Sequence, residues 1–219
     1  MHFEILVEGQ AELTALSILM SKILGEYNQP HTWNIHKHRG IGKLPEDIEA
    51  APKSYDRTLL HNLPSKLRAY GNSMGEYEIV ILLVDLDNRK DCIAFKNELH
   101  SVLDICEQKP NFMIRIAIEE LEAWYFGDQN AIVKAFQNYN EKAFKDYIQD
   151  SQCGTWEKLA EVIHPGGLKA LEDYGRRSVR ILGEKRKWAA LIAPNMNVEE
   201  NKSQSFCCFR DGIRKLASV

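Results

Sequence analysis

Two aspartates stand directly after an apolar run, at a spacing that allows them to act together. In the segment "IVILLVDLD", residues 79–87, six apolar residues precede Asp85, and only Leu86 separates it from Asp87. Two carboxylates crowded at the end of a buried strand repel each other unless a cation compensates them. Hard oxygen ligands of this kind suit Mg²⁺ or Mn²⁺, so the spacing predicts a divalent metal site.

Acidic residues also follow two other apolar segments. The segment "FEILVEG", residues 3–9, delivers Glu8, and "FMIRIAIEELE", residues 112–122, delivers Glu119, Glu120 and Glu122. If these strands are parallel neighbours, their acids converge at the carboxyl edge of the sheet, where open α/β folds bind ligands. The three strand ends together favour a metal site more strongly than any one of them alone.

Gly9 and Glu12 extend this predicted site. A glycine directly after Glu8 permits a sharp strand-to-helix turn and a close approach of a phosphate to the backbone. Glu12 lies one helical turn beyond Glu8, so it can face the same site.

Helix capping is the structural alternative for these acids. Asp87 or Asn88 would then cap the helix that follows them. Residues 119–122 would occupy the first turn of a helix, where acids interact favourably with the macrodipole.

The elements that must position these residues follow from the apolar periodicity. Continuous apolar runs predict strands, and a spacing of three or four predicts helices, in an alternating order. The predicted strands are 3–7, 32–39, 79–84 and 112–118, and the predicted helices are 10–24, about 64–70 with Pro64 in its first turn, and 91–105. This order predicts an α/β fold with a mostly parallel, Rossmann-like sheet flanked by helices.

The chain changes character after Glu119. Helical periodicity dominates residues 120–215, whereas residues 40–56 form a polar connection longer than a turn requires. We therefore expect an α/β core over residues 1–125 and a helical C-terminal region over residues 126–219, packed on that core.

Composition restricts the setting of the protein. The 219 residues carry a net charge of −3, which gives no global attraction to nucleic acid or to an anionic membrane. Five cysteines without a C-x-x-C pair indicate reduced thiols. The N-terminal segment is no signal peptide and no apolar run reaches the length of a bilayer, so we expect a cytoplasmic protein with no membrane contact.

Local basic residues could still contact nucleic acid. Lys43 lies in the polar connection without the spacing of a P-loop, so a solvated loop lysine is the simpler reading. A basic segment, residues 168–188, places four cations near one helical face, which is either plainly solvated or a grip on backbone phosphates. These cations are Lys169, Arg176, Arg180 and Lys187.

Two further groups of residues favour structural roles. His36 and His38 alternate along a strand as zinc ligands might, but no partner has matching spacing, so edge-strand histidines are expected. Trp124 and Tyr125 are expected to pack in the core.

The motifs "ILVEGQAE" and "VILLVDLD" together resemble the toprim domain of topoisomerases, primases, maturation ribonucleases and OLD-type nucleases. Over nearly its full length the chain is similar to a bacterial family of small stand-alone toprim-like proteins, a domain of unknown function. That likeness includes "IAIEELEAWYFGD" and the tail "KWAALIAPNMN…SQSFCCFRDGI". The connection between the motifs is long for a minimal toprim domain, which predicts an insertion near residues 40–60.

The resemblance implies roles for individual residues. Glu8 would be a general acid/base or metal ligand, and Asp85 and Asp87 would be metal ligands. Glu12 looks like the second, helix-borne acid of OLD-type nucleases, and Glu120 or Glu122 like their later acidic ligand. Those enzymes usually have Ser/Thr-x-Glu at this last point, where this chain has Glu120-Leu121-Glu122.

The expected function is therefore a Mg²⁺- or Mn²⁺-dependent, toprim-type nuclease that acts on DNA or RNA. The resemblance further implies a role in bacterial defence, where such toprim proteins often accompany a P-loop ATPase partner. Nothing in this sequence binds ATP by itself, so the pairing is predicted from the likeness alone. A catalytically inert binding or regulatory subunit is the alternative. A D-x-D phosphatase of the haloacid dehalogenase type, or a D-x-D glycosyltransferase, is disfavoured because neither explains Glu8 and Gly9, and Arg89 stands where the phosphatase wants Thr or Val.

Overall fold

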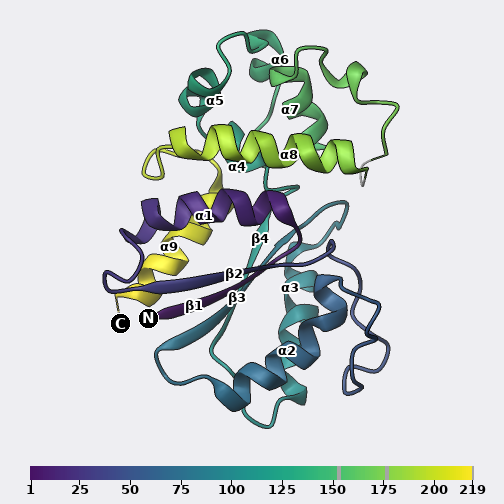
Figure 1. Ribbon diagram of the computed structural model, residues 1–219, viewed down its shortest axis with the longest axis vertical. Coiled ribbons are helices and arrows are strands. Elements are labelled where there is room, and N and C mark those ends of the chain that lie inside the picture. Colours follow the sequence, from purple (N-terminus) through teal and green to yellow (C-terminus); the bar gives the residue numbers. More distant parts are fainter. Residues whose placement is uncertain (152–153, 176–177, 219) are drawn as a thin grey trace.

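The protein has a four-stranded, all-parallel sheet, which confirms the predicted α/β class. The computed structural model describes residues 1–151, 154–175 and 178–218. The strands are β1 (His2–Val7), β2 (Thr32–Lys37), β3 (Glu78–Asp85) and β4 (Phe112–Ala117), in the order β2-β1-β3-β4. The two acid-bearing strands β1 and β3 are therefore neighbours in the middle of the sheet (Figure 1).

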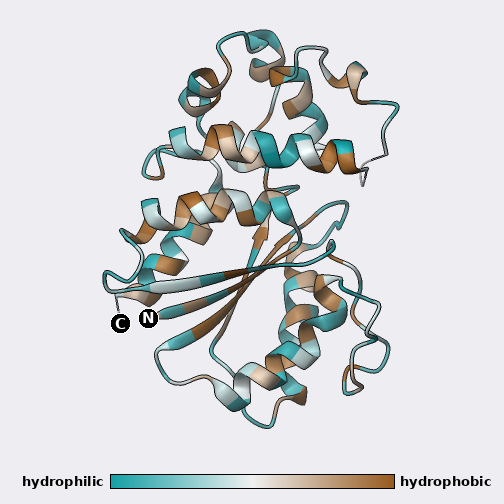
Figure 2. Cartoon of the chain, viewed as in Figure 1, coloured by the Kyte–Doolittle hydropathy of each residue, from teal (hydrophilic) through white to brown (hydrophobic). Residues whose placement is uncertain are grey.

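Both faces of the sheet are buried, as the continuous apolar runs predict. Alternate residues of one strand belong to different hydrophobic clusters, so that Ile5 and Ile81 face one layer of helices and Leu6 and Leu82 face the other. Hydrophobic residues concentrate where strands and helices meet (Figure 2).

Helices cover both faces of the sheet. On one face lie α1 (Gln10–Leu24) and α9 (Gln204–Ala217), and on the other lie α2 (Leu59–Ser73), α3 (Cys92–Ser101) and the short 3₁₀ helix η1 (Val102–Ile105) (Figure 1). The last helix of the chain thus returns to the sheet and packs against β4 and α1.

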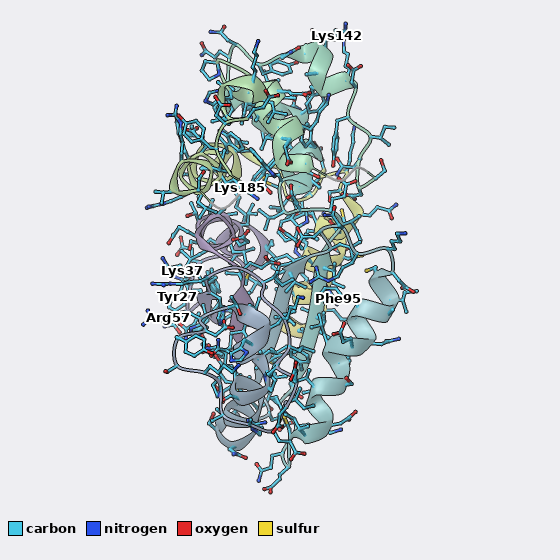
Figure 3. The ribbon with its side chains drawn as sticks, turned by 90° about the vertical axis from the view of Figure 1, so that its right-hand side faces the viewer. Tyr27, Lys37, Arg57, Phe95, Lys142 and Lys185 are labelled. Carbon is cyan, nitrogen blue, oxygen red and sulfur yellow. The ribbon has the colours of Figure 1, made fainter. Side chains whose placement is uncertain are left out.

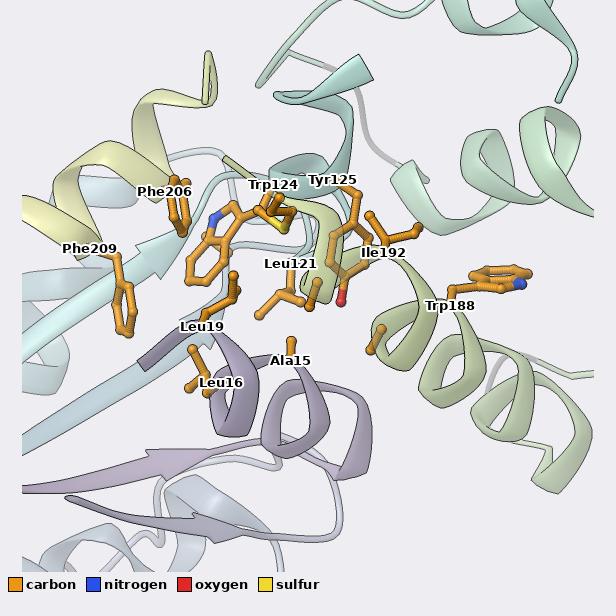
Figure 4. Close-up of a cluster of buried hydrophobic side chains, with 14 of the residues drawn as sticks. Ala15, Leu16, Leu19, Leu121, Trp124, Tyr125, Trp188, Ile192, Phe206 and Phe209 are labelled. Atoms are coloured by element: carbon orange, nitrogen blue, oxygen red, sulfur yellow. The ribbon is translucent and has the colours of Figure 1, made fainter. Parts of the chain in front are cut away.

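The remaining helices form a layer beyond α1. They are α4 (Ala123–Phe126), α5 (Gln129–Ala135), α6 (Glu141–Lys145), α7 (Thr155–Ile163), η2 (Leu168–Ala170), α8 (Val179–Ile192) and η3 (Ala193–Asn195). In this layer α8 packs along α1. Trp124 and Tyr125 are fully buried between α1, α8 and α9, which places them in the core as expected (Figure 4).

Three elements differ from the sequence prediction by more than one residue at an end. The helix expected from Pro64 begins five residues earlier, at Leu59, and Pro64 lies in its interior. A proline there removes one backbone hydrogen bond, but the buried leucines Leu59, Leu60, Leu63 and Leu67 hold that face of the helix against the sheet. The helix expected over 91–105 ends at Ser101 and continues as η1, and the strand expected over 32–39 ends at Lys37.

The long connection between β2 and α2, residues 38–58, has no regular helix or strand. None of the helices in the described ranges is long and apolar enough to cross a bilayer.

Two helical glycines offer a test of the packing. A Cβ on Gly71 would lie 1.8 Å from the carbonyl oxygen of Gln108, whereas nothing lies within 4 Å of the same position on Gly183. We expect Gly71→Ala to lower the free energy of unfolding by about 1–3 kcal/mol, and Gly183→Ala to raise it by roughly 0.5–1 kcal/mol. Urea denaturation of both variants measures this, and a stabilised Gly71→Ala protein would contradict the placement of α2.

Candidate active site

The carboxyl edge of the sheet opens on a cavity of about 1470 Å³. Acids from separate parts of the chain line it together: Glu8, Glu12, Asp85, Asp87 and Glu120. They meet here because β1, β3 and β4 run parallel, so their last residues lie at one edge. The strand order thus brings together residues that are more than 100 positions apart in sequence.

Glu8 joins the ends of the two central strands. Its Oε1 accepts a hydrogen bond of 2.9 Å from the backbone N–H of Asp85, the last residue of β3. Gly9 follows as the N-cap of α1 in extended backbone, with φ −159°, so no left-handed turn requires a glycine there. Its role is spatial instead, because a Cβ on Gly9 would lie 3.2 Å from Oε2 of Glu12.

Asp85 and Asp87 occupy different environments. Asp85 is 7 % exposed at the end of β3, whereas the Asp87 side chain is 37 % exposed and lies 3.7 Å from the guanidinium of Arg89. The backbone of Asp87 is left-handed, with φ 51°, and its N–H donates to the carbonyl oxygen of Glu119 at 2.9 Å. The hydrogen bonding between β3 and β4 therefore extends beyond the strands and fixes the D-x-D turn.

The capping alternative for Asp87 and Asn88 is wrong. The N-cap of α3 is Asp91, whose side chain accepts a hydrogen bond of 2.8 Å from the backbone N–H of Ala94. The carboxylate of Asp87 lines the cavity instead.

The three glutamates after β4 divide into two groups. Glu119 accepts a hydrogen bond of 2.6 Å from the Thr155 hydroxyl, and Glu120 accepts one of 2.8 Å from the backbone N–H of Trp156. Both acids therefore bind the N-terminal end of α7, where the helix macrodipole favours negative charge. The macrodipole alternative applies to α7, and not to the helix that follows these acids directly in sequence.

Glu122 does not bind α7 but forms an ion pair with a lysine. It is 1 % exposed, and its Oε1 lies 3.2 Å from Nζ of Lys185 on α8. The side chain of Lys185 is only 14 % exposed and also lines the cavity. A cation supplied by the protein itself therefore stands among the buried acids.

The sequence analysis did not identify Lys185. A local signal exists, because Lys185 lies four residues after Ile181 and three before Trp188, on the face of α8 that is buried. Burial would lower the pKa of Lys185, but Glu122, Glu120, Asp85 and Glu12 outweigh it and hold that pKa above its ordinary value. The lysine therefore stays charged at any physiological pH.

Burial raises the pKa values of the acids. It raises the pKa of Glu8 to about 8, with help from Glu12, while the Asp85 N–H opposes the shift. It raises the pKa of Glu122 to about 7 against the effect of Lys185, and it raises the pKa of Asp85 well above its usual range, with Glu8 adding to the shift. The site therefore contains carboxyl groups that exchange protons near neutral pH.

The donor chemistry of the site fits Mg²⁺ or Mn²⁺. Hard carboxylate oxygens predominate, and two buried oxygens, Oε2 of Glu122 and the Tyr125 hydroxyl, have no hydrogen-bond partner in the described ranges. As the side chains stand, however, no three Asp, Glu, His or Cys residues in these ranges are arranged to hold a metal ion. Glu8 and Glu122 are engaged by protein donors, so either of them would have to reorient before it could bind a metal.

The basic residues proposed from the sequence lie apart from this cavity. Lys43 is exposed in the connection 38–58, and Lys169 in η2 and Arg180 in α8 are exposed as well. The expected common helical face is wrong, because Lys169 and Arg180 belong to separate helices. Arg180 stacks on the ring of Tyr174 at 4.5 Å, and Arg176 lies outside the described residues.

The two histidines occupy the edge of the sheet. His36 lies on the edge strand β2 and hydrogen-bonds to Glu4, and Nδ1 of His38 lies 2.9 Å from the carbonyl oxygen of Val7. Protein groups therefore explain both rings, as the edge-strand interpretation predicts.

Residues 7–217 match the family described as "Domain of unknown function (DUF4276)", and the chain belongs to that family. No curated protein and no solved structure matches the chain.

Replacing Lys185 tests the compensation of the acids. We expect Lys185→Met to lower the free energy of unfolding by about 3–5 kcal/mol near neutral pH, because it leaves buried carboxylates without their cation. The loss should shrink on acidification, as the carboxylates become protonated. Lys187→Met is the matched control, since Lys187 is exposed on the same helix and should change stability by less than about 0.5 kcal/mol. Equal effects of the two variants would contradict the buried ion pair.

The raised carboxyl pKa values predict how stability depends on pH. The pKa of Glu8 rises from 4.5 to about 8 on folding, so the folded state binds more protons between these values, and stability falls as pH increases through that window. In EDTA, the melting temperature of the wild-type protein should therefore fall from about pH 5 to about pH 8.5. The melting temperature of the Glu8→Gln variant should fall less steeply over the same range. An identical pH profile would show that Glu8 is not the group that titrates.

Proposed function

We propose that this member of the DUF4276 family is a Mg²⁺- or Mn²⁺-dependent nuclease that hydrolyses phosphodiester bonds. The observation that carries the proposal is the convergence of Glu8, Glu12, Asp85 and Asp87 in one cavity that also contains the charged Lys185. A resemblance to toprim domains of the OLD type supports it, since the motifs "VEGQAE" and "LLVDLD" supply these four acids.

The proposed roles follow from the environment of each side chain. Asp85, Asp87 and Glu12 would hold the metal, which when bound supplies a Lewis acid that activates water and stabilises a leaving oxygen. Glu8, whose Oε1 lies at the backbone N–H of Asp85, would accept a proton from the attacking water and return one to the leaving group.

Lys185 contributes a fixed positive charge. Because it lines the cavity and remains protonated, it can stabilise the negative charge that develops on the phosphate oxygens in the transition state. Its hold on Glu122 keeps the ammonium group in place before substrate arrives, so little reorganisation is needed.

A catalytically inert binding subunit is the second candidate function. The specific observation that favours it is the same lysine, which already neutralises part of the acidic cluster without any metal. Isothermal titration with Mn²⁺ separates the two functions. Binding heat that disappears in Asp85→Asn supports the nuclease, whereas no heat together with an unchanged melting temperature in EDTA supports the inert subunit.

Catalysis can be tested with an isosteric pair of substitutions. We expect Asp85→Asn and Asp87→Asn to reduce Mn²⁺-dependent cleavage of single-stranded and plasmid DNA, or of RNA, by at least about 100-fold. Both variants should fold, because asparagine tolerates the left-handed backbone at residue 87 and Asp85→Asn removes a buried charge.

Asp91→Asn is the matched control for these variants. Asp91 lies four residues after Asp87, does not line the cavity and caps α3, a role that asparagine fills equally well. It should retain full activity. Cleavage that survives in Asp85→Asn, or that is lost equally in Asp91→Asn, would exclude the proposed arrangement.

A further inference from the structure

The cavity has a second side that is basic. Lys37, Arg39, Arg57 and Lys66 line it together with the acids, and we call these four residues the basic lip. They come from the end of β2, the connection 38–58 and the first half of α2. Lys37 and Arg57 lie near each other on one flank of the molecule, below Lys185 (Figure 3). The cavity thus has carboxylates at the strand ends and cations along the edge of β2.

Backbone hydrogen bonds build this lip and tie it to the acids. The N–H of Arg39 donates to the carbonyl oxygen of Arg57 at 3.0 Å, which places the two arginines side by side. The N–H of Gly40 donates to the carbonyl oxygen of Glu8 at 2.9 Å. The lip is therefore fixed to the same strand end that carries Glu8.

A glycine secures the close approach of the two chain segments. Gly42 has φ 68°, and a Cβ at this position would lie 2.1 Å from the Thr58 hydroxyl. Only glycine fits a left-handed turn with so little space, so Gly42 allows the connection to pass close to Thr58.

The cations of the lip form no ion pair among the described residues. No carboxylate there lies within ion-pair distance of Arg39, Arg57 or Lys66, although the protein as a whole has more acids than bases. The Lys37 ammonium group donates to the side-chain oxygen of Gln10. Burial lowers the pKa of Lys66, and Glu4 opposes this shift only in part. Lys37, Arg39 and Arg57 are exposed, so their charged groups are accessible to an anionic ligand that enters the cavity.

We propose that the basic lip binds consecutive backbone phosphates of a single nucleic-acid strand, whose scissile phosphodiester then lies over Glu8 and Asp85. This inference rests on the proposed function. Guanidinium pairs recognise phosphate through several N–H donors, and a chain of phosphates is the anion that matches cations spread over three segments.

The position of the acids specifies a single strand. Asp85 and Glu120 are buried at the floor of the cavity, so a phosphodiester must descend into it. A flexible single strand can do so, whereas the phosphates of a duplex stay on the outside of a stiff cylinder. The cavity also exceeds the roughly 300–1,000 Å³ of small-molecule sites, which fits a length of polymer.

Fluorescence anisotropy with a labelled 20-nucleotide oligothymidylate tests the lip without cleavage, in EDTA. We expect Arg39→Ala combined with Arg57→Ala to weaken binding at least 10-fold, and to reduce the slope of log affinity against log salt by about 1.4, since each single-strand phosphate contributes about 0.7. Arg57→Glu alone should weaken binding more than Arg57→Ala. Circular dichroism confirms that the variants fold.

Lys134→Ala combined with Lys142→Ala is the matched control, because both lysines are exposed and lie far from the cavity. It should change the affinity by less than 2-fold. An unchanged affinity and salt slope in the lip variants, no binding by the wild type, or a loss found instead in Lys169→Ala with Arg180→Ala would overturn the proposal. Equally tight binding of a blunt 20-base-pair duplex would overturn the assignment to a single strand.

The outcomes separate this inference from the proposed function. Binding that depends on the lip in a wild-type protein that cleaves nothing with Mn²⁺ would support the lip and reject the nuclease. Metal-dependent cleavage by the wild type with unchanged binding in the lip variants would support the nuclease and reject the lip.

Discussion

The crowding of carboxylates at one edge of the sheet is the constraint on which the rest of the structure depends. Glu12, Asp85 and Glu122 are buried and Glu8 is half-buried, and the carboxylates of Glu8, Glu12 and Glu122 raise the cost of ionising their neighbours. The ammonium group of Lys185 and backbone donors such as the N–H of Asp85 partly compensate these negative charges. Several of the acids nevertheless hold their protons up to near-neutral pH, which gives the site its capacity for proton transfer.

The helical layer beyond α1 supplies the groups that bind the buried acids. Lys185 reaches the acids only because α8 packs along α1 (Figure 1), and Glu119 and Glu120 bind the N-terminal end of α7. The same electrostatic interactions that complete the site therefore attach the layer to the sheet. Loss of any one partner leaves a buried charge behind, so stability and the geometry of the site are coupled.

The cavity combines opposite charges in a consistent order. Acids lie at the ends of the central strands, and the basic lip lies on the side of β2 and α2. A phosphodiester has the complementary arrangement, because its backbone charges need cations while its reacting phosphorus needs a base and a bound metal. Lys185 lines the same cavity and forms an ion pair with Glu122.

The sequence alone determined the strands, the three helices of the α/β part, the helical character of the rest and the acids at the strand ends. These features are local, since continuous apolar runs, a spacing of three or four and an acid after a strand can each be read within about ten residues. The apolar periodicity predicted α1 (Gln10–Leu24) to the residue. The start of α2 was misplaced because a proline is usually found in the first turn of a helix, whereas Pro64 lies in the interior of α2.

Only the tertiary structure decided which charges meet. Lys185 is one of several cations in a basic segment, and its burial depends on the packing of α8 against α1. Arg39 and Arg57 are 18 positions apart, and an irregular connection with no periodicity brings them together. Long-range contacts of this kind depend on the path of the chain in space, which leaves no pattern in the local sequence.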